Sequence, residues 1–549
     1  MDLASVPWKD AYPPGLSPDH PLRAYPVHEI VDRAAERWGS RTAFSFRGQP
    51  LIFRDLKAEV DRCAAAFQRA GIEAGTRVAL LLPNTLYHPI CFFGALKAGA
   101  TVVHLSPLDA ERVLAHKLAD SGARMLVTTN MGELAPRAEA LLDLGALDRV
   151  ILCEDARFGT SPFEGPSISG ARVTSFTDFT EGAASASLPD ISAGDLALLQ
   201  YTGGTTGMPK GAMLTHGNLT TAVESYDAWF AAWGLTRPAE DRVLLFLPLF
   251  HIYALTAVML RALNNGLELI LHTRFDAETA LAEIEAGATS FPGVPTMWIA
   301  IAATPGFETR NLSSLRYCAS GGAPLPVEIA RRLKAATGHN IVGGWGMTET
   351  SPAGTNIPVN RPDKVATIGV PLPGIRLDIV APDDPSRVLP QGQTGELRIF
   401  GPNVTTGYLN RDDETREAFS EGGFLTGDIG FMDDEGFFTI IDRKKDMLLC
   451  GGFNVYPQMI EQAIYEHPDV EEVLVIGVAD GYRGETPKAF IKQRKGSDAL
   501  TIEALRDFLR TRLGPHELPT RLELRDALPR TTVGKLSKLD LKKEEAERG

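Results

Sequence analysis

Short apolar runs alternate with helical patterns through much of this 549-residue chain, and this alternation restricts the fold more than any other feature. The runs are rich in β-branched residues and leucine, as buried strands are, and lie at 78–82, 101–105, 125–129, 150–153, 196–200 and 267–272. Strands that alternate with helices form largely parallel sheets covered by helices. We therefore expect an α/β fold with two layered α/β subdomains in the N-terminal part.

The sequence changes character after about residue 365. Short strands separated by Gly and Pro, at 374–380, 395–400 and 436–441, predict a β-rich subdomain. Beyond the charged cluster at 442–446, the pattern predicts a small α+β domain with helices at 457–467 and 502–513 and strands at 470–478 and 488–492. We expect a domain boundary between residues 442 and 443, giving domains 1–442 and 443–549. The last dozen residues are interpreted as a solvated run of charge.

Charge and cysteine content exclude several classes of protein. The chain has 55 Lys and Arg against 69 Asp and Glu, a formal net charge of −14, which disfavours nucleic acid or an anionic membrane as the main partner. An anionic ligand must therefore meet a local cluster of basic residues. Five scattered cysteines without a CxxC pair predict neither a disulfide framework nor a zinc site and favour a reducing cytoplasm. Residues 1–14 contain no apolar run, so we expect no signal peptide.

One apolar stretch, at 243–260, approaches the length of a membrane span. Pro248 and His251 interrupt it in the middle. We therefore predict a buried strand at 243–247 and a helix at 253–265 that Gly266 ends, and no transmembrane segment.

A loop rich in glycine and threonine follows the predicted strand at 196–200. Residues 201–211 read Tyr-Thr-Gly-Gly-Thr-Thr-Gly-Met-Pro-Lys-Gly. The glycines allow sharp turns, the backbone and hydroxyl groups supply donors, and Lys210 supplies positive charge, which together suit a polyphosphate. The spacing is not that of the P-loop, because Pro209 precedes the lysine and Gly211 follows it. The loop therefore predicts a phosphate-binding site that is not a P-loop.

Four further motifs follow this loop in a fixed order: Trp-Gly-Met-Thr-Glu-Thr at 345–350, Thr-Gly-Asp at 426–428, Asp-Arg-Lys-Lys-Asp at 442–446 and Pro-Arg-Thr-Thr-Val-Gly-Lys at 529–535. Together with the loop, they resemble the motifs of the adenylate-forming (AMP-binding) superfamily over about residues 25–540. Within it, the chain resembles the fatty acyl-CoA synthetases in the segments 248–255 and 291–298. The resemblance implies a large N-terminal domain with the substrate and ATP sites and a small, mobile C-terminal lid.

The resemblance also implies the nucleotide site. The loop residues would bind the phosphates, Thr348 would donate to the α-phosphate, and Thr206 and Glu349 would hold Mg²⁺. Trp345 stands where most family members have Tyr, and its flat face would cover the adenine. The cofactor-binding residues implied in this part of the chain are Thr202, Gly203, Gly204, Thr205, Thr206, Gly207, Lys210, Gly321, Gly322, Ala323, Gly344, Trp345 and Gly346.

The remaining implied residues lie in the C-terminal third, with one exception. Asp428, assisted by Arg443, would bind the ribose hydroxyls, since a carboxylate accepts charge-assisted bonds from two vicinal donors. Lys535 would be the catalytic lysine between the carboxylate and the α-phosphate. Lys445 matches the hinge, and Gly451 and Gly452 the segment used in thioester formation. The exception is His251, which the resemblance places at the acyl pocket.

The function implied is an ATP-dependent acyl-CoA synthetase that converts a medium- or long-chain fatty acid through acyl-AMP to acyl-CoA, with ATP, Mg²⁺ and CoA as cofactor and co-substrates. Aryl-CoA or dicarboxylate-CoA ligation, and transfer from acyl-AMP to a carrier protein, stay open. A luciferase-like oxygenase and a silent nucleotide-binding scaffold are the more distant alternatives. We expect a cytoplasmic monomer or homodimer without nucleic acid partners, and peripheral membrane contact stays open.

Overall fold

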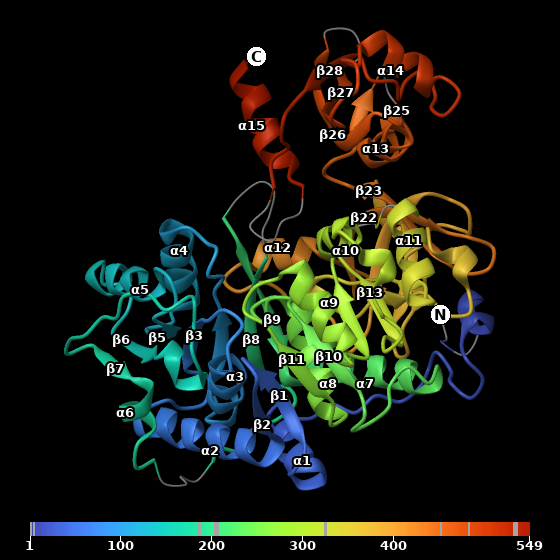
Figure 1. Ribbon diagram of the computed structural model, residues 1–549. Helices are drawn as coiled ribbons and strands as arrows, with labels where there is room; N and C mark the ends of the chain where they lie inside the picture. Colours follow the sequence, from blue (N-terminus) through green and yellow to red (C-terminus); the bar gives the residue numbers. More distant parts are fainter. Residues whose placement is uncertain are drawn as a thin grey trace. The chain divides into compact units, whose positions relative to one another are not determined.

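The computed structural model describes residue 3 and residues 6–183, 188–202, 208–322, 325, 327–450, 453–480, 484–530 and 536–548. The chain divides into two compact units, residues 1–376 with 400–419 and residues 377–399 with 420–549. We call them unit 1 and unit 2 (Figure 1). Unit 2 includes residues on both sides of position 442, and the boundary expected there stays a prediction.

Unit 1 contains two large sheets, each with seven strands among the described residues. The first has the order β7-β6-β5-β3-β4-β8-β9, and its pairs are parallel except β8 with β9. Its strands are β3 (Arg77–Leu81), β4 (Thr101–His104), β5 (Met125–Thr129), β6 (Arg149–Cys153), β7 (Val173–Ser175), β8 (Leu196–Thr202) and β9 (Lys210–Thr215). The runs predicted at 78–82, 101–105, 125–129, 150–153 and 196–200 all fall on these strands.

The second sheet has the order β14-β13-β12-β10-β11-β1-β2, and its pairs are parallel except β1 with β2. Its strands are β1 (Thr42–Phe46), β2 (Gln49–Ile52), β10 (Arg242–Leu245), β11 (Glu268–Leu271), β12 (Ser290–Gly293), β13 (Tyr317–Ser320) and β14 (Ile341–Val342). A small antiparallel sheet joins β15 (Gly344–Trp345), β16 (Thr355–Asn356) and β17 (Val370–Pro371). The α/β class predicted from the alternation is confirmed.

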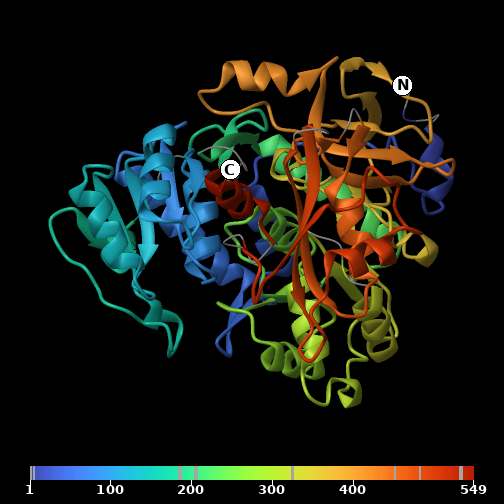
Figure 2. The same cartoon turned by 90° about the horizontal axis from the view of Figure 1, so that it is seen from above.

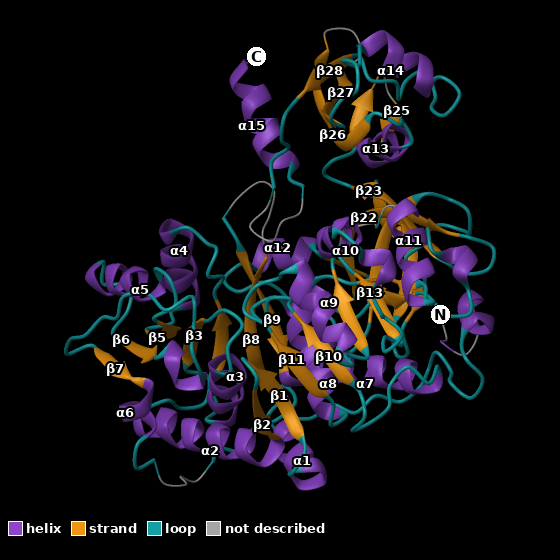
Figure 3. Ribbon diagram, viewed as in Figure 1, coloured by secondary structure: helices purple, strands orange, loops and turns teal. Residues whose placement is uncertain are grey.

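Helices separate the strands of unit 1 and cover its sheets (Figure 3). Figures 1 and 2 show α4 and α5 together beside β5 and β6. The helices are α1 (Glu29–Trp38), α2 (Phe53–Arg69), α3 (Tyr87–Lys97), α4 (Glu111–Ser121), α5 (Leu134–Asp143), α6 (Phe176–Thr180), α7 (His216–Ala232), α9 (Ala277–Glu285), α10 (Pro295–Ala303), α11 (Val327–Thr337) and α12 (Asp412–Glu417).

One core joins the two large sheets of unit 1. Its buried apolar side chains come from α1, α2 and α3 and from strands of both sheets, including Phe44, Val78, Val102 and Leu269. Every residue of α3 is buried. A helix that is apolar on all sides has to be buried, so α3 lies inside the unit.

The apolar stretch at 243–260 forms a strand and a helix, as predicted. After β10 comes a π-helix, Tyr253–Leu260, which continues directly into α8 (Arg261–Asn264). Gly266 follows with a φ of 68°, the left-handed conformation that favours glycine at a helix end. The π form was not predicted, because an unbroken apolar pattern does not distinguish one helical period from another. Among the described residues, no helix is both long and apolar enough to cross a bilayer.

Unit 2 combines two sheets with three helices among its described residues. One sheet has the order β19-β18-β20-β22-β21, with β23 paired to β22, and the other β25-β24-β27-β26, with β28 paired to β27. The elements are β18 (Arg376–Ala381), β19 (Asp384–Val388), β20 (Gly395–Phe400), β21 (Phe419–Ser420), β22 (Gly423–Met432), β23 (Phe438–Arg443), β24 (Leu448–Cys450), β25 (Phe453–Val455), β26 (Val470–Asp480), β27 (Gly484–Gln493), β28 (Arg521–Leu524), α13 (Pro457–Tyr465), α14 (Ile502–Leu509) and α15 (Lys538–Arg548).

The last dozen residues, interpreted as a solvated run of charge, keep their charged side chains half-buried or exposed but are more ordered than that interpretation implies. Residues 538–548 form helix α15, and the Leu541 side chain is fully buried. It packs among apolar residues that include Ile476 on β26 and Phe490 on β27. One leucine in a charged segment therefore gives the helix an apolar contact with the sheet.

Candidate active site

The predicted phosphate loop connects two antiparallel strands of the first sheet. β8 ends at Thr202 and β9 begins at Lys210, and these two residues face each other in register. Because β8 runs parallel to β4, the loop leaves the carboxyl end of a parallel strand, the edge where open α/β sheets bind ligands. The loop residues Gly203, Gly204, Thr205, Thr206 and Gly207 lie outside the described residues, and their roles stay predictions.

Lys210 and Glu349 meet on one tyrosine side chain. The Lys210 ammonium forms an ion pair with Glu414 and lies 5.5 Å from the centre of the Tyr408 ring. The Tyr408 hydroxyl donates a hydrogen bond of 2.7 Å to Oε1 of Glu349. The structure therefore brings together a cation and a carboxylate that are 139 positions apart in the sequence, as their numbers 210 and 349 show.

Glu349 is a buried carboxylate, with 5% of its surface exposed. It lies in a short 3-10 helix, Thr348–Thr350, and half-buried Thr348 precedes it. Burial, together with the Glu349 charge, raises the pKa of Tyr408, so the tyrosine stays a hydrogen-bond donor at neutral pH. Mg²⁺ prefers hard oxygen ligands of this kind. The environment of Glu349 thus fits the metal-binding role implied for it.

Sequence reasoning missed the segment 402–408, which holds this arrangement together. The Asn403 amide donates bonds of 2.7 Å to the carbonyls of Thr350 and Ala353. Thr405 donates through its backbone N–H to the Glu349 carbonyl and through its hydroxyl to the Met213 carbonyl, both at 2.7 Å. The segment therefore connects β9 to the helix of Glu349. Its run of Gly, Pro, Asn and Thr after a strand was the available signal.

Trp345 and its two neighbouring glycines form a tightly packed turn. Trp345 is half-buried and pairs with Thr355 across β15 and β16. A Cβ atom on Gly344 would lie 2.3 Å from the Thr355 carbonyl oxygen, and one on Gly346 would lie 1.4 Å from that of Pro352. Packing of the turn therefore requires both glycines.

We expect Gly346→Ala to destabilise unit 1 by about 3 kcal/mol, because the added methyl group overlaps backbone that has to move. Gly194→Ala is the matched control, since its Cβ would meet only the Ser192 hydroxyl, at 3.7 Å. Thermal unfolding of both variants checks this. Equal unfolding midpoints for Gly346→Ala and the wild type would show that the turn can relax freely.

Three segments that the sequence assigned to the adenine and acyl sites converge in unit 1. Gly321 directly follows β13, and its N–H donates to the Gly293 carbonyl at 3.0 Å. A Cβ atom on Gly321 would lie 3.0 Å from the Tyr253 ring. His251 is half-buried just before the π-helix, where its Nδ1 accepts a bond of 3.3 Å from the Tyr253 N–H. Gly322 has a φ of 82°, and Ala323 lies outside the described residues.

Unit 2 brings Asp428 and Arg443 together. They are register partners on the antiparallel strands β22 and β23, and Nε of Arg443 lies 2.7 Å from Oδ1 of Asp428. The Asp428 side chain is 2% exposed, whereas that of Arg443 is 44% exposed. A carboxylate offers about four acceptor sites, which suits the ribose role predicted for Asp428. Lys445 is exposed two residues further on.

Three predicted residues of the C-terminal part lie outside the described residues. These are Gly451, Gly452 and Lys535, and their roles stay predictions. The chain on both sides of Lys535 is described: Arg530 and Leu536 form an antiparallel bridge.

Comparisons with known proteins agree with the motifs. The AMP-binding enzyme family matches residues 31–409, and the AMP-binding enzyme C-terminal domain matches residues 459–535. A long-chain-fatty-acid–CoA ligase of Bacillus subtilis (strain 168) is 36% identical over 557 residues, which cover 98% of each chain. A feruloyl-CoA synthase of Amycolatopsis sp is 36% identical over 529 residues, 95% of this chain and 98% of that one.

A solved structure shares the fold over most of the chain. ATP-bound MatB from Rhodopseudomonas palustris aligns with a TM-score of 0.84 and 28% identity, over 94% of this chain and 98% of that one. The superfamily resemblance predicted from the five motifs is confirmed, and the chain belongs to the AMP-binding enzyme family.

Proposed function

We propose that the chain is an ATP-dependent acyl-CoA synthetase acting on a medium- or long-chain fatty acid. In the first half-reaction the carboxylate attacks the α-phosphorus of ATP, which gives acyl-AMP and releases pyrophosphate. In the second, the CoA thiol attacks the acyl carbon and AMP leaves. These two half-reactions need no nucleophile from the protein, so catalysis depends on positioning and on electrostatic stabilisation.

The observation that most supports this proposal is the meeting of Lys210 and Glu349 on Tyr408, at the carboxyl end of β8. A cation and a buried carboxylate beside a glycine-rich loop are what a magnesium-bound polyphosphate needs. Mg²⁺, when bound, would neutralise phosphate charge. In this proposal Lys210 binds phosphate oxygens, Glu349 is the metal ligand, and Trp345 covers the adenine.

The acyl substrate is proposed from the segments that converge near Gly321. Residues 248–255 and 291–298 resemble the fatty acyl versions of their motifs, and the name of the Bacillus subtilis relative, a long-chain-fatty-acid–CoA ligase, supports the same choice. The feruloyl-CoA synthase, equally similar in sequence, supports an aryl acid as the alternative.

A substrate panel tests the proposed function. Pyrophosphate release is measured with saturated acids from acetate to stearate, with cinnamates and benzoates, and with dicarboxylates. We expect the highest kcat/KM among acids of medium or long chain, and a CoA thioester as product without any carrier protein. Preference for a hydroxycinnamate would establish the aryl alternative, and product formation only with a carrier protein would establish an acyl-AMP ligase.

The ribose role proposed for Asp428 has its own test. We expect Asp428→Ala to raise the KM for ATP by about 10- to 100-fold, the cost of losing charge-assisted hydrogen bonds, with the KM for the acid changed less than about twofold. Asp434→Ala is the matched control, since Asp434 is exposed at the turn between β22 and β23. An unchanged KM for ATP would remove Asp428 from the nucleotide site.

We also propose the cytoplasm as the location. All five cysteines are buried thiols outside any disulfide, which suits a reducing compartment. The proposed co-substrates, ATP and CoA, are metabolites of the cytoplasm. Fractionation with a tagged full-length chain checks the assignment.

A further inference from the structure

Two lysines in the first turns of helix α15 form ion pairs with other elements of unit 2. Nζ of Lys538 lies 3.0 Å from Oε1 of Glu461 on α13. One helical turn later, Nζ of Lys542 donates a bond of 2.6 Å to Oδ1 of Asp446. Glu461 also accepts a bond of 2.7 Å from the Val475 N–H on β26. The carboxylate that receives Lys538 is therefore itself held by a strand.

The surroundings of Lys538 are rich in carboxyl groups and poor in water. The Lys538 and Glu461 side chains are 15% and 12% exposed. Burial opposes the charge on Lys538, but Glu461, Asp442 and Asp446 outweigh it and raise the pKa of the ammonium group. Asp442 is fixed as well, because its Oδ2 accepts a bond of 2.7 Å from the Gln458 N–H at the start of α13. Lys538 is thus a charged anchor in a preformed acidic site.

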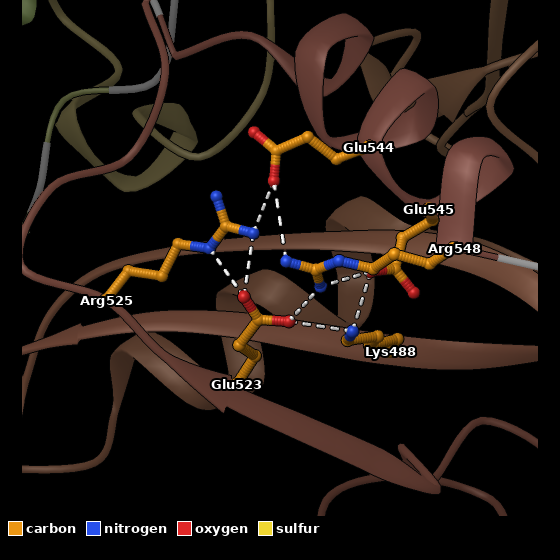
Figure 4. A network of polar contacts seen from close by, with 6 residues as sticks. All are labelled: Lys488, Glu523, Arg525, Glu544, Glu545 and Arg548. Carbon is orange, nitrogen blue, oxygen red and sulfur yellow. Dashed lines mark hydrogen bonds and ion pairs between the residues drawn. The ribbon is translucent and has the colours of Figure 1, made fainter.

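The end of α15 is held by a second set of ion pairs (Figure 4). Lys488 on β27 lies 2.8 Å from Glu523 on β28 and 2.9 Å from Glu545 on α15, and Arg525 lies 2.6 Å from Glu544. Burial would raise the pKa of Glu523, but hydrogen bonds from Lys488, Arg548 and Arg525 outweigh it and lower that pKa to about 2. Together with buried Leu541, the two sets fix the helix along its whole length.

The residues on either side of positions 531–535 pair with each other. Arg530 forms an antiparallel bridge with Leu536 and an ion pair with Glu472 on β26. The Ser537 N–H donates a bond of 2.8 Å to the Pro529 carbonyl. Residues on both sides of the stretch 531–535 are therefore anchored to the same sheet.

We infer that Lys538, held by Glu461, is a positioning residue for Lys535, which precedes it by three positions in the sequence. The inference rests on the proposed function, in which Lys535 carries the adenylation step. A catalytic cation loses much of its effect when it is displaced by about 1 Å. A charged anchor directly after the motif limits that displacement, whereas an apolar side chain of the same length at position 538 would leave the Glu461 carboxylate without its cationic partner and the helix start free to move.

Separate assays of the two half-reactions test the inference. Lys538→Met is expected to slow acyl-AMP formation by about 10- to 100-fold, with the KM for ATP and for the acid nearly unchanged. Thioester formation from supplied acyl-AMP should stay within about twofold of the wild type. Lys538→Arg should restore most of the adenylation rate, because it keeps the charge. The matched control is Lys543→Met, since Lys543 is exposed on the same helix.

A double variant separates an effect through Lys535 from an independent one. If Lys538 acts through Lys535, then adding Lys538→Met to Lys535→Ala costs little further activity, because the cation being positioned is already gone. Multiplicative losses in the double variant would show that Lys538 acts independently and would overturn the inference. An equal loss in both half-reactions of the single variant would do the same.

Amide hydrogen exchange gives a readout that does not depend on activity. Peptides covering residues 536–548 should exchange faster in Lys538→Met than in the wild type and in Lys543→Met. Unchanged exchange there would overturn the anchoring. A wild type that forms no acyl-AMP from any acid would refute the proposed function instead, while faster exchange in Lys538→Met would still establish the anchor. The two failures are therefore distinguishable.

Discussion

Alanine in place of Lys535 is expected to slow acyl-AMP formation by about 10³-fold, equivalent to about 4 kcal/mol of transition-state stabilisation. The attacking carboxylate and the α-phosphate are both anionic, so they repel each other as they approach. A lysine ammonium between them offsets that repulsion and the charge that builds on phosphorus. In the proposed mechanism, few single side chains lower the activation barrier by as much as Lys535.

The measurement separates the half-reactions. Pyrophosphate release reports the first, and CoA thioester formation from supplied acyl-AMP reports the second, which we expect to keep most of its rate in Lys535→Ala. Lys543→Ala controls for loss of a C-terminal charge, because Lys543 is exposed on α15. Equal losses in both half-reactions would contradict an adenylation-specific role.

Glu349→Gln is expected to lower the adenylation rate by about 10²-fold and to raise the Mg²⁺ concentration needed for half-maximal rate by about tenfold. Glutamine keeps the size of the side chain and can still accept the Tyr408 hydrogen bond, but it lacks the negative charge that holds a divalent cation. The substitution therefore tests charge at this position rather than packing.

Magnesium titrations of acyl-AMP formation check this expectation. Tyr408→Phe is the companion variant, because it removes the 2.7 Å bond to Oε1 of Glu349 and leaves the carboxylate in place. We expect it to lose about tenfold in rate, the lower end of the cost of one hydrogen bond to a charged group. A Glu349→Gln enzyme with an unchanged magnesium requirement would place the metal ligand elsewhere.

The strands of unit 1 were predictable because their signals are local. Runs such as 125–129 consist of β-branched and long apolar residues and end at turn residues, so the sequence alone indicates both their type and their limits. The Asp428–Arg443 pair was predictable for a related reason. Its members lie 15 positions apart, by their numbers 428 and 443, on two strands joined by a Gly-containing turn.

The features that escaped prediction depend on partners far away in the sequence. Nothing next to Tyr408 indicates that its hydroxyl will reach Glu349, and nothing in the last eleven residues indicates Lys488, Glu523 and Arg525 as their partners. Such contacts are products of topology, which a single sequence does not specify. Helix α15 illustrates this, since its composition is typical of solvent-exposed chain while its charges are mostly paired.

The π-helix at 253–260 can accommodate a change of one residue in chain length that a regular α-helix could not. Its hydrogen bonds close one residue further along than those of an α-helix, so deletion of a single residue converts it to the α form. The longer turns take up one extra residue, so α8 would keep its buried face toward the core after such a deletion. Gains and losses of one residue here offer an evolving enzyme a way to change the side chains near Tyr253 while β10 and β11 keep their places in the sheet.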